Sequence, residues 1–146
     1  MKMIDVGDKE RTHRIAIATG CVRLGAETLE RIATGRIEKG DVLATARLAA
    51  IMAAKRTPDL VPLCHPIAIT AVVPELELDA AASAVRVRVR VETRDRTGVE
   101  MEALTAVSAA CLTVYDMCKS VDPGMTIDAV RLEEKSGGKS GTWTRA

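Results

Sequence analysis

Asp116 and Lys119 stand three residues apart, directly after a stretch from Ala103 to Tyr115 that contains no charged residue. On a helix, side chains three positions apart lie on the same face and can form an ion pair. A lysine beside a carboxylate can donate a proton to a substrate, and a lysine crowded by other lysines can lose its proton and act as a base. The alternative is an ordinary surface salt bridge, which contributes little to stability.

Glu100 and Glu102 precede the same uncharged stretch. Acidic side chains in the first turn of a helix interact favourably with the positive end of its dipole, and this alone explains Glu100. Glu102 adjoins apolar residues, and a carboxylate that borders buried surface needs a partner such as the N–H edge of an amidine-like ring. Glu102 is therefore a candidate for substrate binding.

His65 is one of only two histidines, and it lies between Pro62 and Pro66. The prolines stiffen the backbone and fix the direction of the imidazole, which could bind a substrate oxygen or phosphate, or transfer a proton. The alternative is a histidine that only caps a loop. The other histidine, His13, lies in a polar N-terminal stretch, and we expect it simply to be exposed.

Three lysines lie beside glycines. Lys39 precedes Gly40 and Asp41, just before a predicted helix, where backbone N–H groups attract anions. Lys135 and Lys139 belong to a glycine-rich stretch that is not a P-loop, because position 133 is glutamate and no helix can follow. This stretch could close over phosphates as a flap, or it could be a disordered tail.

The pattern of apolar residues predicts the elements that carry these side chains. We expect strands at 15–24, 67–79, 85–92 and 126–133, and helices at 26–34, 41–56 and 99–120. Asp41 is the expected N-cap of the second helix, Gly35 ends the first, and Pro74 requires an edge, a bulge or an early end of its strand. Pro58, Pro62 and Pro66 predict an extended, rigid loop.

The order β-α-α-β-β-α-β predicts an α+β, ferredoxin-like split βαβ fold with one additional short helix. Its antiparallel sheet should carry the helices on one face. The other face should show Arg86, Arg88 and Arg90, which alternate with valines and suit a solvated or subunit-facing surface better than an anion site. This fold also serves non-catalytic metabolite-binding modules and RNA-binding domains, so it does not assign a function.

Composition limits the class of protein. The length of 146 residues predicts one domain over residues 1–146, with 134–146 as a mobile tail. With 21 basic and 20 acidic side chains and 1% aromatic residues, nucleic acid is not an expected partner. A charged N-terminus and the lack of a long apolar run predict a cytoplasmic protein without a membrane partner. We expect the four cysteines to be buried thiols rather than disulfides or metal ligands, and no metal site is evident.

Five blocks of this sequence resemble one family, that of cyclic pyranopterin monophosphate synthase, the molybdenum cofactor biosynthesis protein C. They follow the order of the family and span about residues 36 to 141. Together they are highly specific, although each alone would be weak. The blocks are Lys39-Gly40-Asp41-Val42, Leu63-Cys64-His65-Pro66, Gly98-Val99-Glu100-Met101-Glu102-Ala103-Leu104-Thr105, Tyr115-Asp116-Met117-Cys118-Lys119 and Lys135-Ser136-Gly137-Gly138-Lys139-Ser140-Gly141.

The resemblance implies a lyase that converts 3′,8-cyclo-7,8-dihydro-GTP into cyclic pyranopterin monophosphate and releases pyrophosphate, without a redox cofactor. It also implies a role for each residue singled out above. Asp116 would be the catalytic acid residue, paired with Lys119, and Lys39 a second general acid or base. The residues that would bind the substrate are Leu63, Cys64, His65, Glu100, Met101, Glu102, Lys135 and Lys139.

The resemblance further implies a homohexamer built as a trimer of dimers. Glu102 and Asp116, if they lie on one helix, are separated by about 21 Å along its axis, which is too far for one reacting centre to touch both. They nevertheless share a face of the helix that a two-fold partner could cover. We therefore expect an active site at a subunit interface, where Glu102 of one subunit meets Asp116 of another.

Overall fold

The computed structural model describes residues 1–146 and contains a five-stranded antiparallel sheet in the order β2-β3-β1-β4-β5. The central strand β1 (Thr12–Arg23) pairs along its whole length with β3 (Ala84–Asp95) and on its other side with β4 (Thr126–Ser136). The edges are β2 (Ile69–Asp79) and the short β5 (Trp143–Thr144). Pro74 lies in edge strand β2, where its missing N–H breaks no interior hydrogen bond, as predicted.

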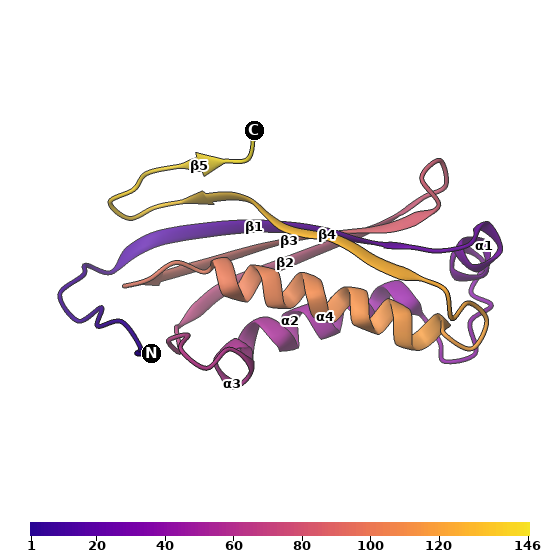
Figure 1. Ribbon diagram of the computed structural model, residues 1–146, viewed down its shortest axis with the longest axis horizontal. Coiled ribbons are helices and arrows are strands. Elements are labelled where there is room, and N and C mark those ends of the chain that lie inside the picture. The colour runs from indigo at the N-terminus through magenta and orange to yellow at the C-terminus, as the bar shows by residue number, and fades with distance from the viewer.

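Two helices cover one face of this sheet, α2 (Val42–Lys55) and α4 (Glu100–Cys118), while α1 (Ala26–Ala33) lies at one end (Figure 1). The other face carries no helix. Crossovers through α2 and α4 connect strands that are separated by one intervening strand, which is the split βαβ pattern. The predicted α+β, ferredoxin-like fold is confirmed.

Alternating side chains explain why the sheet has one covered and one open face. The valines of β3 at positions 85, 87, 89 and 91 are buried, whereas Arg86 and Arg88 point to the open face. On that face, Arg86 Nε lies 2.6 Å from Asp79 Oδ2 and Arg23 Nε lies 2.9 Å from Asp128 Oδ2. Carboxylates of the same chain thus neutralise these arginines.

The helix α4 packs very closely against the sheet. A Cβ atom at Gly20 of β1 would lie 2.8 Å from Val107 Cγ1, closer than real Cβ atoms approach a neighbour. Ala103, Ala106 and Ala110 of α4 are completely buried. Small residues on both sides therefore bring the helix axis near the sheet and fix the direction in which α4 presents its ends.

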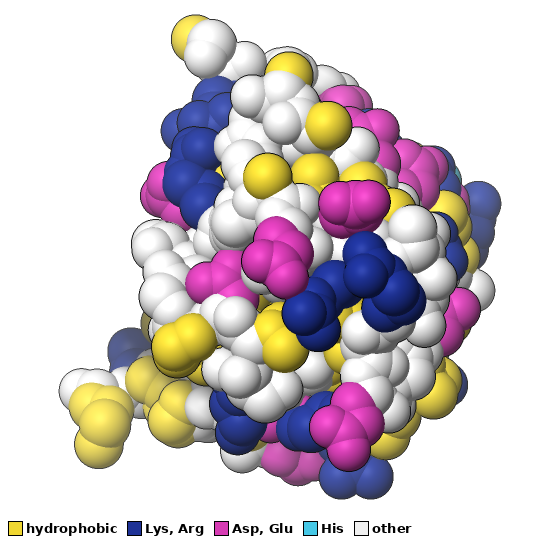
Figure 2. Space-filling view, turned by 90° about the vertical axis from the view of Figure 1, so that its right-hand side faces the viewer, with side chains coloured by type: hydrophobic (Ala, Val, Ile, Leu, Met, Phe, Trp, Pro, Cys, Tyr) yellow, Lys and Arg dark blue, Asp and Glu magenta, His cyan; other side chains and the backbone are white.

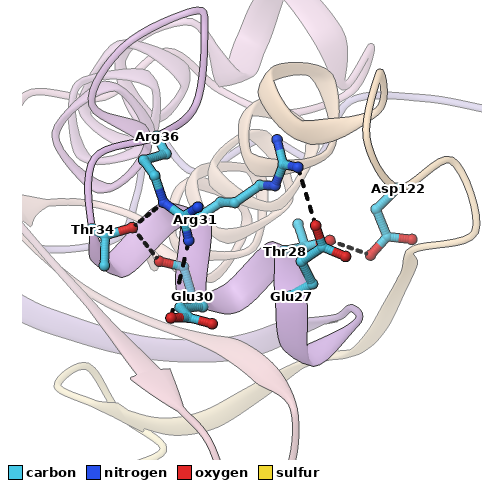
Figure 3. A network of polar contacts seen from close by, with 7 residues as sticks. All are labelled: Glu27, Thr28, Glu30, Arg31, Thr34, Arg36 and Asp122. Carbon is cyan, nitrogen blue, oxygen red and sulfur yellow. Dashed lines mark hydrogen bonds and ion pairs between the residues drawn. The ribbon is translucent and has the colours of Figure 1, made fainter.

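Polar contacts attach α1 to the loop that follows α4. The Asp122 carboxylate accepts hydrogen bonds from the Gly25 N–H at 2.8 Å and from the Thr28 hydroxyl at 2.9 Å. Figure 3 shows the bond from Thr28 to Asp122, together with the bond of 2.9 Å that Arg36 Nε donates to the Thr34 hydroxyl. The two bonds to Asp122 hold the start of α1 near the C-terminal end of α4.

The predicted helix ends are largely confirmed. The Asp41 carboxylate caps α2 by accepting from the Ala44 N–H at 3.0 Å. Gly35 follows the end of α1 with φ +70°, a conformation that favours glycine.

Two predictions for irregular segments were wrong. The loop expected at 58–66 begins with a helical turn, α3 (Thr57–Leu60), because Pro58 occupies the start of the turn, where no N–H is needed. The segment 134–146, expected to be a tail without regular structure, includes the end of β4, and Glu134 and Lys135 pair with Thr144 and Trp143 of β5. The glycines of the stretch act here as the turn of a hairpin.

Candidate active site

Asp116 lies between two lysine side chains at the C-terminal end of α4. Its Oδ2 is 2.8 Å from Lys39 Nζ, and its Oδ1 is 3.1 Å from Lys119 Nζ. Lys39 Nζ also donates to the backbone carbonyl of Asp116 at 3.1 Å. We call these three residues the lysine–aspartate cluster; it belongs to the end of the molecule that Figure 2 faces, where basic and acidic side chains gather.

The lysine–aspartate cluster suits proton transfer beside an anion. Hydrogen bonds from Lys39 and Lys119 hold the pKa of the Asp116 carboxyl below its usual range. Two ammonium groups share one carboxylate, so the cluster keeps a net positive charge that attracts phosphates. Its side chains are about half exposed and thus reachable by a substrate. The predicted pair of Asp116 and Lys119 is confirmed, and the fold adds Lys39 to it.

Glu102, in the first turn of α4, is only 1% exposed. Burial raises the pKa of its carboxyl to about 6. The Cys64 thiol donates to its Oε1 at 3.6 Å, while its Oε2 is buried without any hydrogen-bond partner. The expectation that Glu102 borders buried surface is confirmed. A buried carboxylate oxygen with no partner is an acceptor available to an N–H group.

Cys64 differs from the other cysteines. All four thiols are free, as predicted, and Cys21, Cys111 and Cys118 are buried, but Cys64 is partly exposed. Burial and the neighbouring Glu102 raise the pKa of the Cys64 thiol to about 11, so it stays protonated and acts as a hydrogen-bond donor. The expectation of a buried thiol is thus wrong at Cys64, which is partly exposed.

Glu100 and Lys135 meet on the other side of the same helix end, with Lys135 Nζ 3.3 Å from Glu100 Oε1. Lys135 pairs with Ala16 of β1, so the sheet positions it rather than a flexible flap. Lys139 is exposed and forms no ion pair. We call Cys64, Glu100, Glu102 and Lys135 the glutamate cluster.

The remaining predicted residues adjoin the glutamate cluster along the chain. Leu63 and Met101 are apolar yet 45% and 39% exposed. His65 is partly buried, and its backbone carbonyl accepts a hydrogen bond from the Cys64 thiol at 3.7 Å. Exposed apolar side chains next to buried acceptors are typical of sites that bind the face and the edge of a flat ring.

One chain does not bring the two clusters together. Asp116 and Glu102 lie on α4 fourteen positions apart, about 21 Å at the standard rise. The helix runs along the length of the sheet, so the clusters lie toward opposite ends of the molecule (Figure 1).

Sequence reasoning missed two contacts. His13, expected to be simply exposed, lies on β1 with Nε2 2.8 Å from Glu92 Oε2. The carboxylate of Asp122, in the loop after α4, holds the start of α1 in place. The pairing of β1 with β3 and the end of α4 create these contacts, and no local spacing signals them.

No group of three or more His, Cys, Asp or Glu side chains is arranged to hold a metal ion. None of the helices combines the length and apolar character that crossing a bilayer requires.

A ferredoxin-like sheet that carries these two clusters defines a class of protein, the small α+β enzymes that act on a small molecule. Within this class the chain belongs to the MoaC family, whose family model matches residues 3–138. It is 57% identical over 144 residues to the cyclic pyranopterin monophosphate synthase of Thermomicrobium roseum, covering 99% of this chain and 87% of that protein.

Two further relatives carry the same name. The protein of Rhodospirillum rubrum is 56% identical over 142 residues, covering 97% of this chain and 86% of the relative. That of Roseiflexus sp. is 59% identical over 140 residues, covering 96% and 89%. The resemblance found in the five sequence blocks is therefore confirmed over nearly the full length.

Proposed function

We propose that this protein is a cyclic pyranopterin monophosphate synthase, a lyase of molybdenum cofactor biosynthesis that converts 3′,8-cyclo-7,8-dihydro-GTP into cyclic pyranopterin monophosphate and releases pyrophosphate. Membership of the MoaC family and the names of the relatives support this activity. The observation in the structure that favours it most is the lysine–aspartate cluster, in which two lysines flank one carboxylate.

The reaction needs several proton transfers. The imidazole part of the purine opens, a pterin and a pyran ring close, and a cyclic phosphate forms as pyrophosphate leaves. In this proposal Lys119 and Lys39 donate and accept protons, and Asp116 holds both ammonium groups at the reacting atoms. The Asp116 carboxylate also holds both lysine side chains in place before the substrate phosphates bind beside them.

The glutamate cluster is proposed to hold the base. Glu102 Oε2 would accept from an N–H group of the ring, and the Cys64 thiol would orient the carboxyl. Leu63 and Met101 would pack against the ring face, with His65, Glu100, Lys135 and Lys139 assisting in substrate binding.

We also propose that the active site is shared between subunits of a homohexamer, a trimer of dimers in the cytoplasm. The distance of about 21 Å between the clusters supports this, because one reacting centre cannot contact both ends of α4 in a single chain. A partner packed antiparallel by two-fold symmetry would place its lysine–aspartate cluster beside the glutamate cluster.

Incubation of the purified protein with 3′,8-cyclo-7,8-dihydro-GTP tests the proposal. We expect release of one pyrophosphate per pterin product, both followed over time, and no release from uncyclised GTP as the matched control. Tight binding of the cyclised compound without pyrophosphate or pterin would instead indicate a non-catalytic metabolite-binding module.

A further inference from the structure

A small cavity lies where β1, β4 and the start of α4 meet, with Arg14, Lys135, Ser136 and Ser140 among its lining residues. Its volume is about 40 Å³. One water needs roughly 10–15 Å³ on this measure, so the cavity has room for a phosphoryl group but not for a base or a ribose.

Arg14 is unusual among the arginines of this protein. Only Arg14 and Arg96 are both partly buried and outside any ion pair; the other partly buried ones, Arg31 and Arg90, pair with glutamates. Removing part of a guanidinium from water without an anionic partner costs free energy, so such a group is expected where an anion binds.

The backbone, rather than a carboxylate, positions Arg14. Its Nε donates to the carbonyl oxygen of Asp95 at 3.2 Å. The carboxylate of Asp95 is engaged elsewhere, accepting from the N–H groups of Ala68 at 3.1 Å and Arg96 at 2.8 Å. The terminal nitrogens of Arg14 make no hydrogen bond within the chain and remain able to bind two oxygens of one ligand.

The turn after β4 packs directly on this guanidinium. Gly137 and Gly138 have φ +94° and +74°, and a Cβ at Gly138 would collide with Arg14 Nη1. A Cβ at Gly137 would collide with the backbone carbonyl of His13. Both glycines are thus needed for the turn to lie against Arg14 and to keep its side chain at the wall of the cavity.

The charges that line the cavity favour an anion. Glu100 compensates Lys135 at 3.3 Å, so the charge of Arg14 is left over. Ser136 and Ser140 add hydroxyl donors. Arginine binds phosphate oxygens in pairs through its planar fork of N–H groups, which a lysine cannot reproduce.

We propose that Arg14, together with Lys135, binds a terminal phosphoryl group of the triphosphate, the part of the substrate that leaves as pyrophosphate. This inference rests on the proposed function, but inorganic pyrophosphate alone can test it. Arg14 then sets the specificity for a triphosphate over a monophosphate, while Glu102 and Cys64 of the glutamate cluster bind the base.

Calorimetric titration of the full-length protein with inorganic pyrophosphate measures this binding directly. We expect Arg14→Gln to weaken it about tenfold to a hundredfold, the usual effect of removing charge-assisted hydrogen bonds, and Arg14→Lys to weaken it less. Arg94→Gln is the matched control, because Arg94 is exposed on β3 opposite His13, away from the cavity, and it should bind as the wild type does.

A second variant should change pyrophosphate affinity in the opposite direction. Glu100→Gln removes the negative charge beside Lys135 and should tighten pyrophosphate binding severalfold, which a merely structural role of this region would not produce. Unfolding temperatures without ligand show whether each variant is folded. If Arg14→Gln does not fold, pyrophosphate binding by Arg14→Lys and Glu100→Gln tests the proposal instead.

The proposal is overturned if the wild type does not bind pyrophosphate, if folded Arg14→Gln binds it within twofold of the wild type, or if Glu100→Gln weakens binding. Turnover separates this result from the proposed function. A wild type that releases pyrophosphate from the cyclised substrate, with Arg14→Gln unaffected in pyrophosphate binding and KM, keeps the function and refutes only the phosphate site. A wild type without turnover refutes the function itself, and with it the identity of the ligand.

Discussion

Asp116 accepts hydrogen bonds from two lysines that reach it from different parts of the chain, Lys119 from its own helix and Lys39 from the loop before α2. The shared carboxylate thus holds both ammonium groups within about 3 Å of one residue. Because all three side chains are about half exposed, their ion pairs contribute little to folding, and a functional role explains the arrangement better than stability does.

Replacement of Lys119 by Ala, or of Asp116 by Asn, should lower turnover at least about a hundredfold, because each removes a group that transfers or controls a proton. The free energy of unfolding should fall by less than about 1 kcal/mol. Steady-state assays and denaturant titrations of the same preparations check both values. Arg36→Ala, which removes a nearby exposed cation outside the cluster, is the control. Near-normal turnover of either variant would show that the replaced residue takes no part in the chemical reaction.

The buried Glu102 predicts a pH dependence of stability. Its pKa is about 6 in the folded protein and about 4.5 in the unfolded chain. Between these two values, a rise in pH deprotonates Glu102 in the unfolded chain but not in the folded protein. The free energy of unfolding therefore falls as the pH rises, and above pH 6 this loss of stability is complete. A shift of this size corresponds to about 2 kcal/mol.

Because Glu102→Gln has no carboxyl at this position, its free energy of unfolding should not fall in this way as the pH rises. From pH 4 to pH 8, the unfolding free energy of the variant minus that of the wild type should increase by about 2 kcal/mol, as measured by urea titration at each pH. Glu134→Gln, on strand β4 and away from Glu102, serves as the control and should show no such change. A difference that is constant with pH would mean that Glu102 titrates like an exposed glutamate.

At the scale of the elements, the close approach of α4 to β1 determines where both clusters lie. Gly20 allows this approach, since a side chain there would press on Val107 of α4 and Val130 of β4. Both the lysine–aspartate cluster and the glutamate cluster depend on the ends of α4, so a displaced helix affects both.

Gly20→Ala should destabilise the fold by about 1–3 kcal/mol, the usual cost of overpacking a core, and should also reduce turnover. Gly124→Ala is the control, because the nearest atom to an added Cβ there is Asp122 Oδ1 at 4.0 Å; its stability should stay within about 0.5 kcal/mol of the wild type. Thermal unfolding of both variants compares them. Equal stability would show that the sheet and helix can separate without cost.

At the scale of the whole molecule, the two clusters at opposite ends of α4 predict complementation between inactive variants. Glu102→Ala and Asp116→Asn should each be inactive alone. After random exchange of subunits in a shared-site dimer, half of the dimers are mixed, and each mixed dimer contains one intact site, so about a quarter of wild-type activity should return.

The complementation assay requires that exchange be confirmed by mass and that both variants remain folded. A mixture of the wild type with Asp116→Asn, carried through the same exchange, controls for activity lost during handling. A fully exchanged mixture that stays as inactive as its parts would show that Glu102 and Asp116 do not join across a subunit interface.

The sequence by itself determined the fold and the chemistry available to it. Alternating valines in β3 could only bury one face of a strand, and Asp41 supplied the cap for α2, because strand alternation and helix capping depend on neighbours a few residues apart. The pair of Asp116 and Lys119 followed from the same local geometry.

Only the tertiary structure decided which distant residues meet. Lys39 reaches Asp116 across 77 positions of the chain, the Cys64 thiol reaches the buried Glu102, and Arg14 lies beside Lys135 through the pairing of β1 with β4. The glycine-rich stretch became a hairpin turn because β1 offered a strand edge to pair with. Local patterns limit the conformation of each segment, whereas such contacts depend on how α4 packs on the sheet, and that packing is set by the complementary shapes of residues far apart in sequence.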